Sequence, residues 1–131
     1  MKIVFAAEAK SVLGPAEWFT GQVWIEQIDA PAYSRLRASR VYFSPGARTA
    51  WHTHPVGQTL HVVEGVARVQ SEGSEVRELT SGDTASFEPG EPHWHGATPA
   101  RPMVHLALSD ADSDGEIADW GEHVTDEEYG A

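Results

Sequence analysis

Short apolar runs, each ended by a turn-forming residue, are the feature that most constrains how this chain can fold. Through the first hundred residues the runs do not repeat at the period of about 3.6 that marks an amphipathic helix. Gly, Pro, Ser and Asp stand between them, and these residues favour turn conformations. The candidate strands are residues 23–28, 36–43, 50–54, 58–64, 66–70, 76–79, 84–87, 93–97 and 103–109. Short strands at this density predict an all-β fold, either a sandwich or a small barrel of the jelly-roll type.

The net charge of −11 lies mostly at the C-terminal end of the 131 residues. Nine of the twenty acids and none of the nine Lys and Arg fall in residues 110–131, which leaves residues 1–109 with eleven acids, nine bases and a net charge of −2. No cluster of Lys and Arg is available to neutralise phosphates, so nucleic-acid binding and polybasic membrane docking are excluded. No apolar run approaches the ~20 residues of a membrane span, and the run 3–7 is shorter than a signal-peptide core of about 7–15 residues. We therefore expect a cytoplasmic protein with a small-molecule substrate.

Residues 110–131 are expected to form a short acidic C-terminal extension. The segment 117–120 fits a short strand or a turn, and Thr125 with Glu128 fits a capping box that starts a helical turn. Trp120 and Tyr129 would be exposed in a disordered tail, so we expect part of the extension to pack on the barrel or on a neighbouring subunit. The acidic side chains themselves are expected to form a solvated surface.

Two pairs of histidines fall on predicted strands. His52 and His54 are two residues apart and share one face of a strand, and His93 and His95 repeat the arrangement. Gln58 can join the first pair across a short turn. The chain has no cysteine, which excludes thiolate ligands, and imidazole suits Mn, Fe, Co, Ni, Cu and Zn. Three imidazoles and one oxygen donor leave positions open on a six-coordinate ion, so the pattern predicts a divalent transition-metal site.

The remaining histidines and the tryptophans beside the pairs have different expected roles. His61 points to the opposite face of its strand from Gln58, and we expect it and His123 to be structural. His105 lies on the last predicted strand. Trp51 and Trp94 alternate with the paired histidines, so they should point outward and pack on an outer layer or at a dimer interface.

Two stretches resemble the motifs of the cupin family. The first motif is matched in spacing by Gly46, His52, His54, Gln58 and Gly65, and the second by Gly82, Gly90 and His93. Gln58 stands where the family usually has Glu, while the departures at Glu88 and Ala97 touch no ligand. The resemblance implies a single jelly-roll-type cupin β-barrel over residues 1–131, with its motif region at 46–97. It also implies one divalent metal held by His52, His54, Gln58 and His93.

A narrower resemblance runs nearly end to end, through residues 14–21, 45–55, 90–96 and 120–126. These stretches are similar to the small bacterial cupins that include manganese-dependent hydroxynitrile lyases, which also carry Gln at the fourth ligand position. The resemblance implies Mn(II), although Fe, Co, Ni or Zn fit the same ligands. It places His95 and His105 as catalytic histidines. Ser109 departs from it, because a Gln is expected there near the pocket.

The neutral ligand set favours Lewis-acid chemistry over redox cycling. A Gln ligand in place of Glu leaves the ion its full charge, which strengthens its hold on an oxyanion and disfavours higher oxidation states. Our hypothesis is a hydroxynitrile lyase that reversibly cleaves an aromatic cyanohydrin such as mandelonitrile to an aldehyde and HCN. His95 would act as general base, and His105 would orient or protonate the cyanide. The expected pocket lining is Ser39, Val41, Phe43, Leu60, Val62 and Ser109.

Two alternatives would use the same metal site. A cupin dioxygenase or other oxidoreductase would need oxygen for turnover, whereas a non-catalytic cupin would bind the metal or a small ligand without any reaction. Exposed strand edges of β domains are commonly covered by another element. We therefore expect a homodimer or a homotetramer.

Overall fold

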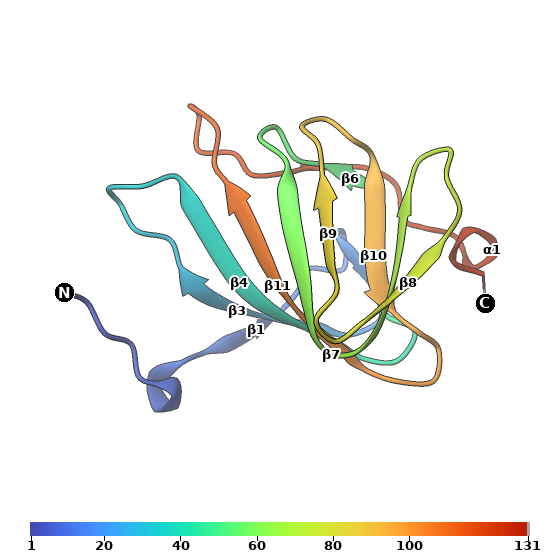
Figure 1. Ribbon diagram of the computed structural model, residues 1–131, viewed down its shortest axis with the longest axis horizontal. Helices are drawn as coiled ribbons and strands as arrows, with labels where there is room; N and C mark the ends of the chain where they lie inside the picture. The colour runs from blue at the N-terminus through green and yellow to red at the C-terminus, as the bar shows by residue number, and fades with distance from the viewer. Residues whose placement is uncertain (131) are drawn as a thin grey trace.

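The computed structural model describes residues 1–130 as an antiparallel sheet that curls into a half-barrel (Figure 1). Its strands are β1 (Ser11–Leu13), β2 (Phe19–Thr20), β3 (Val23–Asp29), β4 (Leu36–Phe43), β5 (Arg48–Thr49), β6 (His52–Thr53), β7 (Gln58–Ser71), β8 (Arg77–Thr80), β9 (Thr84–Phe87), β10 (His93–Ala97), β11 (Met103–Asp110) and β12 (Asp119–Trp120). The helical elements are η1 (Ala6–Glu8), a 3₁₀ turn, and α1 (Asp126–Tyr129). Among these residues no helix has the length and the apolarity to cross a membrane.

The all-β prediction is confirmed, and three predicted strands, 36–43, 84–87 and 93–97, have the observed bounds. Of the predicted strand 50–54 only residues 52–53 form a strand, β6, and the separate strand β5 ends just before residue 50. Both strands pair with β10, but on the other side β5 pairs with β2, while β6 pairs with β12. Strands β1 and β2 were not predicted, because two or three residues are too few to display alternation.

Strand β7 is the longest element of the sheet and corrects a second prediction. The sequence predicted two strands, 58–64 and 66–70, whereas the structure has one strand of 14 residues that continues through Gly65. Its first half pairs with β9 and its second half with β8 and β10. Gly65 has a φ of 80°, and a Cβ on it would clash with the carbonyl oxygen of Pro102. The glycine that looked like a strand end therefore bends one continuous strand between two parts of the barrel.

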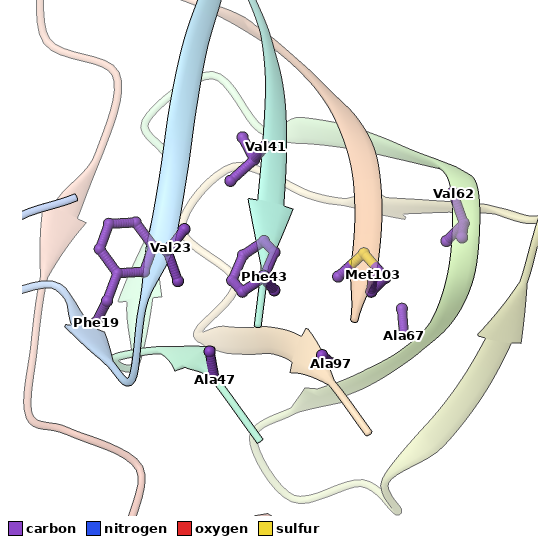
Figure 2. Packing of buried hydrophobic residues seen from close by; sticks show 9 residues of the cluster. All are labelled: Phe19, Val23, Val41, Phe43, Ala47, Val62, Ala67, Ala97 and Met103. Carbon is purple, nitrogen blue, oxygen red and sulfur yellow. The ribbon is translucent and has the colours of Figure 1, made fainter. Parts of the chain in front are cut away.

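The main hydrophobic core lies inside the curl of the sheet. Strands on different sides of the barrel contribute its side chains, which point toward one another in Figure 2. The cluster consists of Phe19, Val23, Val41, Phe43, Ala47, Val62, Ala67, Ala97 and Met103. Burial of apolar area, at roughly 25 cal/mol per Å², is the main stabilising contribution of such a core. Phe19, Val41 and Phe43 also line a cavity of about 760 Å³, so the core forms part of its wall.

The C-terminal extension packs on the barrel, as the sequence predicted. Thr125 caps α1 in a complete capping box with Glu128. Tyr129 is buried against Trp94 and donates a hydrogen bond to the Ala97 carbonyl. The outer layer expected over Trp94 is therefore the chain's own C-terminal end.

Arg48, on strand β5 of the barrel, also anchors the extension. Its guanidinium donates to the carbonyl oxygen of Val124 and to the carboxylate of Asp126, both at 2.8 Å. It also lies 4.5 Å from the centre of the Tyr129 ring, a geometry that permits a cation–π contact. The buried Arg48 side chain is held by groups of the extension, so the extension packs as part of the folded protein.

The bend at Gly65 can be tested against a glycine that shares its backbone conformation. Gly65→Ala and Gly73→Ala both place a side chain at a φ near 80°, which costs of order 1–3 kcal/mol. A Cβ at Gly73 meets nothing within 4 Å, whereas one at Gly65 meets the Pro102 carbonyl. We expect Gly65→Ala to lower the free energy of unfolding by at least about 2 kcal/mol more than Gly73→Ala, measured by urea denaturation. Equal losses would show that the close approach at Gly65 is unimportant.

Candidate metal centre and active-site cavity

Adjacent strands bring three of the predicted ligands together. His52 on β6 is the direct antiparallel partner of His93 on β10, and their ring centres are 4.3 Å apart. His54 follows β6 by one residue, and its ring centre lies 4.9 Å from that of His52 and 5.3 Å from that of His93. All three side chains are buried. The structure therefore gathers the His-x-His pair and the first histidine of the second pair around one point.

Each of these three imidazoles is held through its Nδ1 atom by a backbone carbonyl. A carbonyl oxygen only accepts hydrogen bonds, so Nδ1 carries the hydrogen in every case. In a neutral ring the Nε2 atom then keeps a free lone pair, which is the tautomer that binds a metal. The bonds run from His52 to Ala50 at 2.9 Å, from His54 to Ile117 at 2.6 Å and from His93 to Glu91 at 2.9 Å.

Burial keeps these three rings neutral. It is the largest cause that lowers the pKa of each, because a charged imidazolium is poorly solvated in the interior. For His93 the pKa falls to about 4. The pKa of His52 is lowered further by the nearby His93, and that of His54 is lowered mainly by burial alone. At neutral pH all three Nε2 lone pairs are therefore available.

Gln58, the first residue of β7, completes the predicted ligand set. Its Oε1 atom lies 3.5 Å from Nε2 of His93, and its side chain also contacts His54. Both facing atoms, the amide oxygen and the bare ring nitrogen, carry lone pairs. The Nε2 atom of His54 is buried and has no hydrogen-bond partner in residues 1–130. A cation between these atoms would satisfy all of them, so the donor set fits a divalent metal.

His95 and His105 form a second histidine pair beside this centre. Nδ1 of His95 and Nε2 of His105 are 3.2 Å apart, and both rings are buried. Burial, reinforced by His105, lowers the pKa of His95 well below its ordinary value, and burial lowers that of His105 to about 4. The outer nitrogens, Nε2 of His95 and Nδ1 of His105, have no hydrogen-bond partner within the described chain. Both rings are therefore neutral, and each presents an unused nitrogen.

The tightest trio of ring nitrogens differs from the predicted one. Ligand atoms of His52, His93 and His95 lie within 4.8 Å of one another, and His54 is outside this trio. The hydrogen bonds distinguish the four rings, because His95 is held by another histidine and the other three by carbonyls. Four imidazoles thus surround the centre, three of them in the carbonyl-held form typical of metal ligands.

Four of the five histidines open into a cavity of about 760 Å³, whereas His93 is not part of its lining. Ser39, Val41 and Phe43 line it, as expected from their shared strand face, and so do His95 and His105. The other lining residues that matter below come from the two ends of the chain: Trp18, Phe19, Ile117 and Trp120. Its wall is thus mostly apolar with a few polar groups, as in small-molecule sites generally.

Three expected lining residues lie elsewhere. Leu60 packs with Val69 and Phe87, and Val62 belongs to the main core, so both point inward but lie outside the cavity lining. Ser109 lines a separate hollow of about 290 Å³, whose wall also includes Gln58. Strand alternation predicted the direction of these side chains, whereas their distance from the metal centre depends on the curvature of the sheet.

The sequence analysis did not place Trp120 in the site. Its ring stacks on that of His52 at 4.5 Å between centres and on that of Trp18 at 5.0 Å. A large aromatic side chain within an acidic extension indicated that this part of the extension packs on the barrel or on a neighbouring subunit. The partner could not be identified, because it lies near the other end of the chain.

Comparison with known proteins identifies the family of this chain. The model of the cupin domain family matches residues 39–109, a span that contains every predicted metal ligand. The chain belongs to the cupin family. An (R)-mandelonitrile lyase from Granulicella tundricola is 50% identical over 130 residues, which cover 98% of each chain.

Solved structures support the same fold. A cupin-like protein from Thermotoga maritima superimposes with a TM-score of 0.84 at 37% identity, covering 89% of each chain. A polyketide cyclase from Streptomyces resistomycificus superimposes with a TM-score of 0.76 at 20% identity, covering 95% of this chain and 86% of its own. The second likeness concerns the fold alone.

The neutral histidines predict how the metal-free protein responds to acid. Burial holds the pKa of His93 and of His105 at about 4, against an ordinary value of 6.5. Between these values the unfolded chain binds more protons, so stability is full above pH 6.5 and is lost as the pH falls toward 4. We expect His105→Gln to reduce this slope by up to about 1.4 kcal/mol per pH unit, the contribution of one proton. Urea unfolding at several pH values measures it, and parallel wild-type and variant curves would contradict it.

Proposed function

We propose that the protein is a metal-dependent hydroxynitrile lyase that reversibly cleaves an aromatic cyanohydrin such as mandelonitrile to an aldehyde and HCN. The observation that carries the proposal is the pair of adjacent histidine groups, four of whose five rings line one cavity. Three carbonyl-held imidazoles fit a metal, and His95 beside them has a buried nitrogen with no partner in residues 1–130. The 50% identity to an (R)-mandelonitrile lyase supports the same conclusion.

In this proposal His52, His54, His93 and Gln58 hold one divalent ion, Mn(II). When bound, such an ion supplies a Lewis acid that stabilises negative charge on the substrate oxygen. All four ligands are neutral, so nothing in the ligand set offsets the positive charge that the substrate oxygen meets. The donor set favours this role over a change of oxidation state, which carboxylate ligands would support better.

His95 is proposed as the general base. For its Nε2 to accept a proton, its Nδ1 must carry the hydrogen, and that hydrogen is then donated to Nε2 of His105 across 3.2 Å. His105 thereby fixes the tautomer of His95 and stabilises the ring once it is protonated, as an acceptor behind a catalytic histidine generally does. Burial keeps the pKa of His95 low, so the ring is unprotonated and ready before substrate binds.

The proton balance of the reaction is simple. The Nε2 atom of His95 removes the hydroxyl proton, the C–CN bond breaks with its electron pair leaving on cyanide, and the oxygen becomes the aldehyde carbonyl. Because Nε2 of His105 accepts the hydrogen bond from His95, the hydrogen of His105 is on Nδ1, the atom without a partner in residues 1–130. We propose that this N–H orients the departing cyanide. Cyanide leaves as HCN with the proton that His95 took, and both histidines return to their starting state.

The apolar cavity wall is suited to the aryl group. Val41, Phe43 and Trp120 line it around the histidines, and a benzene ring packs favourably on aromatic and branched side chains. A hydroxyl end toward the metal centre and an aryl end against this wall define one orientation of the substrate.

Metal binding tests the assignment of ligands. We expect His54→Ala to weaken Mn²⁺ binding by more than about 100-fold, because a lost ligand costs more than the 10–100-fold typical of a group that orients one. His95→Ala should bind Mn²⁺ about as tightly as the wild type. Calorimetric titration of the metal-free variants with MnCl₂ measures both. The opposite order would make His52, His93 and His95 the ligands and remove His95 as the base.

Cyanide release from mandelonitrile tests the activity. The manganese-loaded protein should release cyanide, chelation should abolish release, and added Mn²⁺ should restore it. His95→Ala should lower the rate by about 10²–10⁴-fold, the usual contribution of a general base. His61→Ala is the matched control, because this half-buried histidine bonds Thr84 and is absent from the cavity lining.

The same assay separates the lyase from its alternatives. Rates should be equal with and without oxygen, because no step consumes it. Oxygen-dependent turnover would favour a dioxygenase, and a manganese-loaded protein that releases no cyanide would contradict the proposed function.

A further inference from the structure

Residues 111–121, which we call the strap, lead from the end of β11 back to the metal centre. In Figure 1 this segment runs along one end of the barrel until it reaches β6. Five of its residues line the cavity: Gly115, Glu116, Ile117, Ala118 and Trp120. The strap lies outside the stretch matched by the cupin family, which ends at residue 109.

The strap holds one proposed ligand through a backbone atom. His52 and His93 donate to carbonyls only two residues away in their own segments, whereas His54 donates to Ile117, 63 residues along the chain. At 2.6 Å this is the shortest of the three bonds. The orientation of the His54 ring therefore depends on where the strap lies.

The strap also supports the strand that carries His52. Strand β6 has two residues, and Trp120 is the direct partner of His52 across the β12–β6 pair. The pairing continues beyond the strand, since the Gly121 N–H donates to the Trp51 carbonyl at 2.7 Å and the Trp51 N–H to the Glu122 carbonyl at 2.9 Å. The Trp120 ring stacks on the His52 ring itself. Two proposed ligands thus contact the strap directly.

Asp112 gives the strap its shape ahead of Ile117. One carboxylate oxygen of Asp112 accepts hydrogen bonds from the backbone N–H groups of Asp114 and Glu116, both at 2.9 Å. The Asp112 N–H donates to the Glu116 carbonyl at 2.8 Å. These bonds close a compact turn that ends one residue before the Ile117 carbonyl. Asp112 itself is not among the residues that line the cavity.

We infer that Asp112 is a positioning residue of the metal centre, and that docking of the strap and binding of the metal stabilise each other. The inference rests on the proposed metal site. A bound metal fixes the His54 ring, and through the ring's hydrogen bond it also fixes the Ile117 carbonyl. Conversely, a docked strap holds that carbonyl, and so the ring, in place before the metal binds. Because linkage is reciprocal, anything that loosens the strap must weaken metal binding by the same factor that the metal tightens the strap.

Metal affinity of three variants tests the first half of the inference. Asp112→Ala removes both side-chain bonds and should weaken binding of Mn²⁺, and of Zn²⁺ tested separately, by about 10-fold or more. Asp112→Asn keeps an amide oxygen as acceptor and should restore most of the affinity. Asp83→Ala is the matched control, because Asp83 makes a similar turn with Thr80 away from the cavity. Wild-type affinity in Asp112→Ala overturns the inference.

Hydrogen exchange of the wild-type chain tests the second half without any substitution. Mass spectrometry should show that Mn²⁺ slows exchange in peptides covering residues 111–121 and leaves α1, which is anchored by Arg48 and Tyr129, unchanged. In Asp112→Ala the strap should exchange faster without metal. Exchange of the strap that is indifferent to metal overturns the inference, as does a wild-type chain that binds neither ion.

These results are independent of the lyase assay. If metal protects the strap and no cyanide is released from mandelonitrile, the proposed function fails while the coupling stands. If cyanide is released and metal does not change hydrogen exchange of the strap, the coupling fails while the proposed function stands.

Discussion

The structure depends on keeping five clustered, buried imidazoles neutral, four of which line one cavity. No carboxylate joins the one group of three His, Asp or Glu that lies close enough to hold a metal among residues 1–130. The rings therefore avoid mutual repulsion only by staying unprotonated, and burial achieves this by lowering the pKa of each. A neutral ring has two possible tautomers, so the hydrogen-bond acceptor beside one nitrogen decides that the other nitrogen keeps the free lone pair. The carbonyls behind the rings are thus as important to the site as the rings.

The three carbonyl acceptors lie in short segments outside the strands of the barrel. Strands β7 and β11 pair to form one wall of the barrel, and Gly65 lets β7 continue from one part of the barrel into the other. The ligand strand β6 is only two residues long, with β10 on one side and β12 on the other. Such a strand has little structure of its own, and its neighbours determine where its side chains lie.

The sequence revealed the histidines because their spacing carries the information locally. His52 and His54 share a strand face through an alternation of two, and no distant contact is needed to recognise it. Trp120 and the Ile117 carbonyl could not be assigned, since their roles appear only when the chain returns to β6 after more than sixty residues. Leu60 and Val62 were predicted to face inward and do so. Their placement in the core depends on how tightly the sheet curls, which alternation does not encode.

The neutral ligand set also explains why ring orientation carries so much weight. A site with carboxylates attracts a cation through charge over several ångströms, and a small error in position costs little. Three imidazoles and an amide offer lone pairs instead, whose attraction for a metal falls off sharply with distance and angle. Their affinity must come from lone pairs already aimed at one point. The extension holds nine acids, yet its closest contribution to the ligands is a neutral carbonyl of Ile117 that fixes the His54 ring.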